Sequence, residues 1–564
     1  MQHNCAISAK LSKYPERWGL ERGSHLGLSL LLPNSSSPDL WIIMKLSLIS
    51  VIICLAVQSA LAAPKVNKPR KTAPLLINPD AQPDLPTARV AQAAADAAGL
   101  NITDVQGDIL IGMKKNKELF FFFGIKNATD FKSKLSSDIA PLITPTNALL
   151  PGSTPPDTAV NIAFSKTGLD TLGVTDDLGD ISFNGGQFTD ATALGDPGTG
   201  NWVPGFAGTN IHGVLLLASG TVDNINDELA SIQSALGDSI TEIYRLQGAA
   251  RPGDQEGHEH FGFMDGISQP AVNGFTPDVH PGQMNVSAST ILLGVDGDNT
   301  RPPWATGGSF LAFRQLQQKV PEFEKYLVDN ALDMPGLTPQ ENAELLGARF
   351  IGRWKSGAPI DLAPLRDDPD LAIDVNRNND FTFDHPEIPG FDITTNQTFC
   401  PFSAHIRKSR PRDDFSPDES FTRPIMRAGI PYGPEVTDDE KASNTSSSDP
   451  SLERGLAFVS YQSDLNTGFR FIQQNWVDAA DFFFGKSHSG ECPVRQPNQP
   501  FDPIIGRDSN AGSVAPPDSD RTISGSDPLD KNHIFTLDID FVVSRGGEYF
   551  FSPPISALTG KLAQ

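Results

Sequence analysis

Segments with the pattern of a strand alternate with segments with the pattern of an amphipathic helix, and this rhythm occurs in both halves of the 564-residue chain. Apolar runs rich in β-branched and aromatic residues predict strands, and a 3.6-residue apolar period predicts helices. In the first half the expected strands are 107–125, 212–220 and 239–251, and the expected helices are 127–143 and 221–237. In the second half the expected strands are 308–318, 455–464 and a pair within 532–554, and the expected helices are 320–332 and 465–484.

Long excursions separate these units, and the strands are spaced too widely for a doubly wound parallel sheet. We therefore expect an α+β fold of two similar halves, each an antiparallel sheet covered by helices on one face. The Pro- and Gly-rich span 270–308 is the expected junction, which predicts an N-terminal domain at 96–290 and a C-terminal domain at 291–564. The low-complexity segments 438–451 and 507–528 are expected to be mobile loops.

The N-terminal part carries the pattern of a targeting segment. From Met44 a Lys is followed by an apolar run and by the small residues Ala60 and Ala62, which is typical of a secretory signal peptide at 44–62. A membrane anchor is the alternative, because the apolar run is almost long enough to span a bilayer. The small-residue site and the following Pro64 favour cleavage, so we expect no stable membrane anchor.

The regions on either side of this signal are expected to be absent from the mature protein. Residues 1–43 would place the signal inside the chain, which indicates that they are a non-native extension. A basic cluster at 67–71 and the Pro- and Ala-rich composition after it predict a pro-segment at 63–95. A net charge of −24 argues against nucleic acid or anionic membranes as partners.

In a secreted protein, the cysteines and the N-x-S/T sequons become candidate sites of disulfide formation and glycosylation. Cys400 and Cys492 could form one disulfide in an oxidising compartment, and two buried thiols are the alternative that the sequence leaves open. Five N-x-S/T sequons are candidate glycosylation sites: Asn101, Asn127, Asn285, Asn396 and Asn444.

The stretch 258–270 crowds ionisable residues and turn residues between aromatics. Asp265 lies between two glycines, and glycine permits close backbone approach, so a carboxylate could be held here next to a flat ligand. An Asp-Gly turn with a solvated carboxylate is the ordinary alternative. His258, His260 and Asp265 would also supply the ligand set of a non-haem iron site, with both imidazoles on one face of a strand.

Two more clusters contain candidate site residues. His405 lies in a small, apolar frame and could ligate haem iron, while Arg407 and the neighbouring cations could pair with haem propionates. The alternative is a core histidine beside a solvated basic run. Arg427, before a glycine turn, is permanently charged and can stabilise a developing anion, or it can be a surface arginine at a turn.

Taken together, these clusters resemble the dye-decolorizing peroxidases, and most closely the secreted fungal type. The sequence "GFMDG" at 262–266 is similar to the G-x-x-D-G signature of that family, His405 to its proximal haem ligand and Arg427 to its distal arginine, in the same order. The segments 455–462 and 471–476 extend the resemblance, which runs from about residue 107 to near the C-terminus. Because all three clusters occur in the order found in the family, the functional interpretation of each cluster is favoured over its structural alternative.

The resemblance implies two ferredoxin-like halves, the dimeric α+β barrel fold, with one haem b between them and held mainly by the second half. It implies a peroxidase that reduces hydrogen peroxide and oxidises anthraquinone and azo dyes and phenolic compounds by one-electron steps. Asp265 would accept the proton of peroxide, and Arg427 would stabilise the negative charge as the O–O bond breaks. Because Asp titrates below His, we expect an acid-side activity optimum.

The resemblance also implies roles for other residues. Asp502 is the expected carboxylate behind His405, where it would raise the basicity of the imidazole. Leu456 and Phe458 are expected to line the distal face of the haem. Large dyes cannot enter a channel of peroxide size, so Tyr432 and Trp476 are expected to carry electrons from the surface.

Two other functions remain as alternatives at this point. A haem-binding or iron-releasing protein without peroxidase turnover would need only His405 and a pocket, so the presence of Asp265 and Arg427 favours the enzyme. A non-haem iron oxidoreductase would use His258 and His260 instead. The enzyme is expected to be a secreted, extracellular monomer or homodimer without a nucleic-acid partner.

Overall fold

A computed structural model describes Leu75, Ile77, Asn78 and residues 83–208, 210–414, 423–479, 482, 501–507 and 521–564. These residues belong to one compact unit, Thr72–Gln564. The extension expected at 1–43 and the signal peptide expected at 44–62 lie outside the described residues. Within the described part of the chain, no helix combines the length and apolarity needed to cross a membrane.

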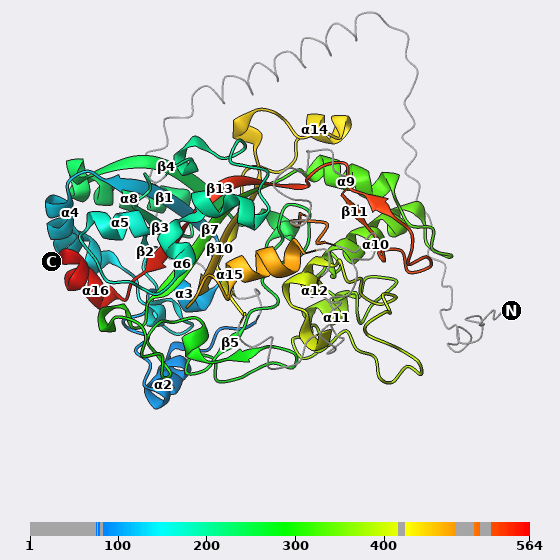
Figure 1. Cartoon of the computed structure of the whole chain (residues 1–564), viewed down its shortest axis with the longest axis horizontal. Coiled ribbons are helices and arrows are strands. Elements are labelled where there is room, and N and C mark those ends of the chain that lie inside the picture. The colour runs from blue at the N-terminus through cyan, green and yellow to red at the C-terminus, as the bar shows by residue number, and fades with distance from the viewer. Residues whose placement is uncertain are drawn as a thin grey trace, which may run out of the picture. The chain divides into compact units, whose positions relative to one another are not determined.

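Nine strands from both halves of the chain form one antiparallel sheet, whose central strands are visible in Figure 1. Their bounds are β1 (Lys117–Ile125), β2 (Thr158–Phe164), β3 (Gly213–Ser219), β4 (Ile240–Ala249), β7 (Ser309–Gln318), β8 (Met426–Arg427), β9 (Ile430–Tyr432), β10 (Gly455–Gln462) and β13 (Val542–Ser552). The order β7-β13-β2-β3-β1-β4-β9-β10 is closed by pairing of β10 with β7, so the sheet is a barrel. The α+β barrel is confirmed, and the two halves share one sheet.

The run of four phenylalanines in β1 shows why this strand reads as continuously apolar. Successive side chains of a strand point to opposite faces. Phe120 and Phe122 point into the barrel, where the ring of Phe122 lies 4.9 Å from that of Phe313 on the non-adjacent strand β7. Phe121 and Phe123 point outward into a second core. Both faces are buried, so polar and apolar residues do not alternate.

Helices cover the outward face of the barrel strands β1 to β4. They are α4 (Ala128–Lys134), α5 (Lys166–Thr171), α8 (Val222–Leu236) and α16 (Ile555–Thr559). In α8 the side chain of Thr221 accepts a hydrogen bond from the backbone N–H of Asn224, which caps the helix as its sequence predicts. Ile225 and Leu229 from the apolar stripe of α8 are buried against the sheet.

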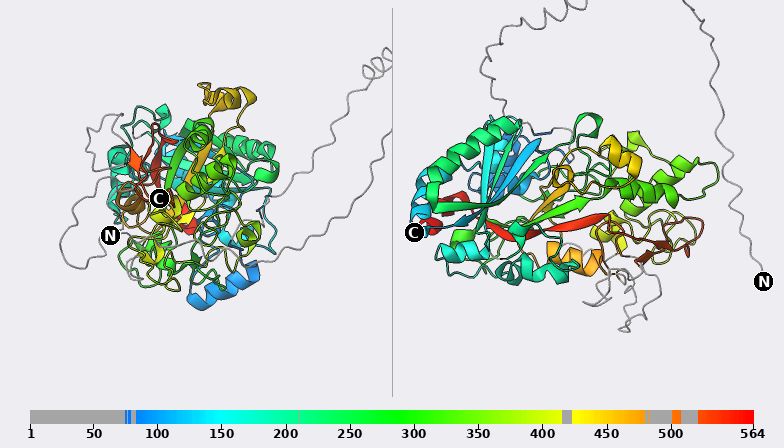
Figure 2. Two further views of the ribbon diagram at one scale, coloured as in Figure 1. Left: turned by 90° about the vertical axis from the view of Figure 1, so that its right-hand side faces the viewer. Right: turned by 90° about the horizontal axis from the view of Figure 1, so that it is seen from above.

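A second lobe extends from the other side of the barrel, away from α4 and α16 (Figures 1 and 2). It contains α9 (Val320–Asp329), α10 (Pro339–Ile351), α11 (Pro369–Ile373) and α12 (His405–Ser409). These helices surround a third apolar core that includes Phe323 and Phe350. The lobe therefore has its own packing and can support a site beside the barrel.

The structure differs from three sequence-based expectations. The first part of 107–125 is helical, α3 (Asp108–Ile111), because a short buried apolar run fits either element and Gly112, with φ of +72°, ends the helix. The segment 438–451 contains α14 (Asp438–Ser443), whose Glu440 is buried against Arg454. The strands expected to pair within 532–554 have other partners: β12 (Phe535–Thr536) pairs with β11 (Thr522–Ile523), and β13 with β7.

The end of the expected pro-segment 63–95 is integrated into the unit. Its last residues lie in α2 (Ala88–Ala98), where Ala91 and Ala95 are fully buried in the same core as the barrel interior. Thr87 caps this helix. The stretch before residue 99 therefore contributes packing to the barrel side.

The barrel interior should be sensitive to the loss of one ring. We expect Phe122→Ala to lower the free energy of unfolding by about 3–5 kcal/mol, because it removes a fully buried side chain that contacts four other rings. Urea unfolding should show a lower midpoint at an unchanged slope. The control Ile181→Ala, at a side chain that is 83% exposed, should stay within about 0.5 kcal/mol of the wild type. Equal effects of the two substitutions would contradict the assignment of the core.

Candidate active site

A cavity of about 330 Å³ lies where the outer face of β7 and β10 meets the second lobe. It is lined by Asp265, Arg427 and His405, which the chain separates by up to 162 residues. Leu456 and Phe458 of β10 line it as well, as expected. Most of the wall is apolar, which fits a flat apolar ligand with a few polar anchors.

Asp265 and Arg427 form an ion pair in this cavity. Asp265 Oδ1 accepts hydrogen bonds from Arg427 Nη1 at 2.5 Å and from the backbone N–H of Gly266 at 2.6 Å. Burial alone would raise the pKa of Asp265, but the charge of Arg427 and these two hydrogen bonds outweigh it and lower that pKa. The carboxylate is therefore held ionised in acid.

Gln269 fixes the backbone of Arg427, a role that sequence reasoning missed. Its Nε2 donates to the carbonyl oxygen of Arg427 at 2.6 Å, and its Oε1 accepts from the N–H of Arg427 at 3.1 Å. Gly112 packs against the same carbonyl so closely that an added Cβ would lie 2.8 Å from it. No local signal marks Gln269, because its partner is 158 residues away.

His405 begins α12 and is oriented by Asp502. Its Nδ1 lies 2.7 Å from Asp502 Oδ2, and Asp502 Oδ1 accepts from the N–H groups of Ile504 and Ile505 at 2.8 and 3.2 Å. Burial would lower the pKa of His405, but the carboxylate of Asp502 raises it. Since Nδ1 faces the carboxylate, Nε2 is the ring nitrogen available to a metal.

Three guanidinium groups in the cavity wall have no carboxylate partner within ion-pair distance among the described residues: Arg353, Arg410 and Arg412. They donate instead to neutral oxygens, such as Asn379 Oδ1 and the carbonyl of Gly282. Burial lowers the pKa of Arg353 to about 9 and that of Arg410 to about 10. This excess positive charge, beside an apolar wall and a histidine, fits a haem with its two propionates.

Arg407 lies elsewhere. It does not line the cavity; its guanidinium is 1% exposed and makes two hydrogen bonds of 2.7 Å with Asp414. The rings of Phe383 and Phe402 flank it at 4.7 and 4.5 Å from Cζ. Arg407 of α12 is thus turned away from the cavity, and of the cations expected to pair with propionates Arg410 and Arg412 line the cavity wall.

Tyr432 and Trp476 are both buried, with 4% and 5% of their surface exposed. Trp476 lines the cavity and lies in a π-helical turn, Ile472–Val477, that continues α15 (Phe469–Phe471). The hydroxyl of Tyr432 donates to Glu453 Oε1 at 2.8 Å. Trp476 is therefore in contact with the cavity, whereas Tyr432 is hydrogen-bonded to the half-buried carboxylate of Glu453, just before β10.

The two histidines of the expected non-haem iron site do not converge with Asp265. His260 Nε2 lies 2.9 Å from the carbonyl oxygen of Tyr432, and His258 Nδ1 lies 3.1 Å from that of Glu256. Neither residue lines the cavity, and His260 lies in a turn rather than a strand. The described residues contain no group of three His, Cys, Asp or Glu arranged to hold a metal ion.

The surface sites expected from secretion are accessible to different degrees. Asn396 is half-buried, whereas the other four sequon asparagines are exposed: Asn101, Asn127, Asn285 and Asn444. Cys400 is buried and has no disulfide partner among the described residues, and burial raises the pKa of its thiol to about 12. Cys492 lies outside the described residues.

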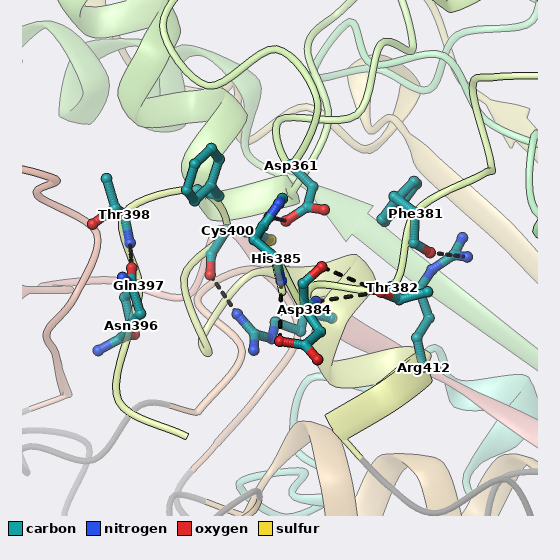
Figure 3. Close-up of polar contacts among 12 residues, drawn as sticks. Asp361, Phe381, Thr382, Asp384, His385, Asn396, Gln397, Thr398, Cys400 and Arg412 are labelled. Atoms are coloured by element: carbon teal, nitrogen blue, oxygen red, sulfur yellow. Dashed lines mark hydrogen bonds and ion pairs between the residues drawn. The ribbon is translucent and has the colours of Figure 1, made fainter. Parts of the chain in front are cut away.

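A buried carboxylate and a histidine meet in the second lobe, close to Cys400 (Figure 3). His385 Nε2 lies 3.3 Å from Asp361 Oδ1, and its Nδ1 lies 3.2 Å from Glu387 Oε1. The hydrogen bond to Asp361 is the main cause that raises the pKa of His385. Asp361 is 2% exposed, so its contact with His385 compensates a carboxylate that is largely removed from water.

Two family comparisons match consecutive parts of the chain. Residues 104–252 match the family described as "DyP dimeric alpha+beta barrel domain", and residues 258–482 match "Dyp-type peroxidase, C-terminal". Together they cover more than half of the chain. The protein therefore belongs to the dye-decolorizing peroxidases, a haem-dependent family that oxidises dyes and phenolic compounds with peroxide.

Individual relatives are similar over almost their whole length. Peroxidase 2 of Mycetinis scorodonius is 61% identical over 92% of this chain and 100% of its own. A dye-decolorizing peroxidase of Auricularia auricula-judae is 51% identical over 88% of this chain and 92% of its own. The crystal structure of a decolorizing peroxidase from the latter fungus has a TM-score of 0.74 at 50% identity, covering 82% of this chain and 100% of that chain. These similarities confirm a peroxidase and do not support a haem carrier or a non-haem iron enzyme.

The Asp361–His385 pair should make stability depend on pH. The pKa of His385 is raised in the folded state. Its contribution to the free energy of unfolding is therefore fully present below the pKa of the unfolded state, about 6.5, and is lost as pH rises through the pKa of the folded state. We expect His385→Gln to be less stable than the wild type at pH about 5.5, with a difference that narrows above about 7. Urea unfolding at several pH values measures this, and Asp361→Asn should remove the same pH dependence. A difference that grows with pH would contradict the assignment.

Proposed function

We propose that the cavity binds one haem b per chain through His405 Nε2 and that Asp265 and Arg427 carry out the reaction with hydrogen peroxide. The observation that carries this proposal is the placement of the Asp265–Arg427 pair and His405 in one cavity. The bound haem supplies the redox-active iron that takes up the two oxidising equivalents of peroxide. The cavity-lining Arg353, Arg410 and Arg412 would hold its propionates.

Asp265 has the geometry of a general base. Both of its hydrogen bonds described above end on Oδ1, so Oδ2 is the oxygen that would accept the first proton of peroxide and return it to the leaving oxygen as water forms. Gln269 holds the backbone of Arg427, and the guanidinium lies beside Asp265, where it would stabilise the negative charge on the leaving oxygen. Asp265 would thus act through Oδ2, and Arg427 through its guanidinium.

On the other side of the cavity, Asp502 would keep Nδ1 of His405 in its hydrogen bond and so fix the ring plane and the free nitrogen. Leu456 and Phe458 would restrict the space above the ligand to a molecule of peroxide size. Bulky dyes would then be excluded from direct contact with the reacting atoms.

Electrons from bulky dyes would therefore pass through side chains. Trp476 borders the cavity and stacks on Phe482 at 5.4 Å, which supports a path through this aromatic pair. Oxidation of Tyr432 would release a phenolic proton, and Glu453 is positioned to accept it.

We also propose that residues 44–62 direct secretion and that the mature, extracellular chain is glycosylated at its exposed sequons. Support comes from the N-terminal pattern and from the exposure of Asn101, Asn127, Asn285 and Asn444. Asn396 is the less accessible acceptor.

Replacing the base should slow the peroxide step. We expect Asp265→Asn to bind haem normally but to react with hydrogen peroxide roughly 10²-fold more slowly or worse, because the proton acceptor is lost. Stopped-flow absorption of the haem band measures the rate. Asp254→Asn, an exposed carboxylate eleven positions earlier in the same region, serves as the control and should react like the wild type. Since the pKa of Asp265 is lowered, activity should extend into acid, and a rate profile that peaks above about pH 7 would contradict the proposal.

The proposed electron path predicts a selective defect. Trp476→Phe combined with Tyr432→Phe should lower the turnover of a bulky anthraquinone dye, while the stopped-flow rate with peroxide stays near that of the wild type. Tyr326→Phe is the matched control, since this tyrosine is equally buried but lies in the core of the second lobe. Unchanged dye turnover in the double variant would dismiss the path.

A further inference from the structure

Met113 contacts the distal arginine from the turn between α3 and β1. Its Sδ lies 3.8 Å from Arg427 Nη1 and accepts a hydrogen bond from it. The same nitrogen donates to Asp265 Oδ1 at 2.5 Å. One NH2 group of the guanidinium therefore donates to both a carboxylate and a thioether.

The thioether of Met113 is open to reaction with peroxide. Met113 is half-buried, and its sulfur contacts Arg427, which lines the cavity. A thioether is a weak hydrogen-bond acceptor, and peroxide converts it to a sulfoxide, which is polar. The enzyme draws this oxidant to Arg427 and Asp265 in every catalytic cycle.

We propose that Met113 is a site of oxidative modification, at which excess hydrogen peroxide forms a sulfoxide that slows the reaction of the enzyme with peroxide. The inference rests on the proposed roles of Asp265 and Arg427. In the step itself the sulfur lone pair attacks one peroxide oxygen and the O–O bond breaks. That oxygen stays on sulfur, the other leaves as water with both hydrogens, sulfur loses two electrons and peroxide gains them.

The consequence follows from the position of Arg427 Nη1, which donates to both Met113 and Asp265. A sulfoxide oxygen accepts hydrogen bonds far more strongly than a thioether sulfur, so Nη1 would turn toward Met113 and weaken its bond with Asp265. Gln269 and Gly112 fix only the backbone of Arg427, which leaves its guanidinium free to move between the two acceptors.

Other methionines near the site provide comparisons. Met264 and Met284 line the cavity, and Met426 is buried in β8. Among the described residues, Met113 is the methionine whose sulfur accepts a hydrogen bond from Arg427. Oxidation at Met264 or Met284 would add polarity to the cavity wall without this direct effect on the Asp265–Arg427 pair.

The test exposes the holoenzyme to increasing amounts of hydrogen peroxide without a dye. Peptide mass spectrometry measures the gain of one oxygen atom at each methionine, and stopped-flow absorption measures the remaining rate of the peroxide step. We expect the fraction of Met113 sulfoxide to follow the loss of rate, with fully modified enzyme about tenfold slower. Treatment with methionine sulfoxide reductase should restore the rate.

For each variant, the rate of the peroxide step after exposure is divided by its own initial rate. During exposure to peroxide, this relative rate should fall several-fold more slowly in Met113→Leu than in the wild type. In the matched variant Met284→Leu it should fall as it does in the wild type. Rate loss while Met113 remains a thioether would overturn the proposal, and so would complete oxidation of Met113 without any loss. Failure of the proposed function has a different signature: Asp265→Asn would then react with peroxide as fast as the wild type.

Discussion

The pairing of β10 with β7 is the contact on which both the barrel and the site depend. It closes a sheet that joins strands from the two halves, so one continuous core fills the barrel. The same two strands present their outer faces to the cavity, where Leu456 and Phe458 form part of the wall. Because side chains alternate along a strand, closing the barrel with one face necessarily places the other against the second lobe.

Within the cavity, the ionisable side chains are stabilised by other groups of the protein rather than by water. Arg427 keeps Asp265 ionised, Gln269 fixes the backbone of Arg427, and Asp502 holds one nitrogen of His405. Buried charges are costly without such compensation, so each of these charged groups needs a partner on another segment. Arg353, Arg410 and Arg412, which lack a carboxylate partner within the described part of the chain, are the exception, and their charge is the strongest indication of an anionic ligand.

Local signals predicted much of this arrangement. The cap and apolar stripe of α8 and the three motifs around Asp265, His405 and Arg427 can be read directly from neighbouring residues. Features that depend on distant partners could not be read in this way. The low-complexity composition of 438–451 predicts a mobile loop, but the structure has helix α14 there. This helix is stabilised by the ion pair of its Glu440 with Arg454, a partner that local sequence does not indicate.

The sequence by itself predicted the α+β class and most elements, because propensity, periodicity and spacing act over a few positions. The candidate site residues Asp265, His405 and Arg427 were predicted from the resemblance of their three motifs to a known family. Only the tertiary structure decided that the halves share one barrel, that Gln269 fixes Arg427, and that Arg407 belongs to Asp414 instead of the cavity. These outcomes depend on which distant groups come into contact when charge and apolar surface are buried together. Local sequence patterns do not indicate such long-range partners.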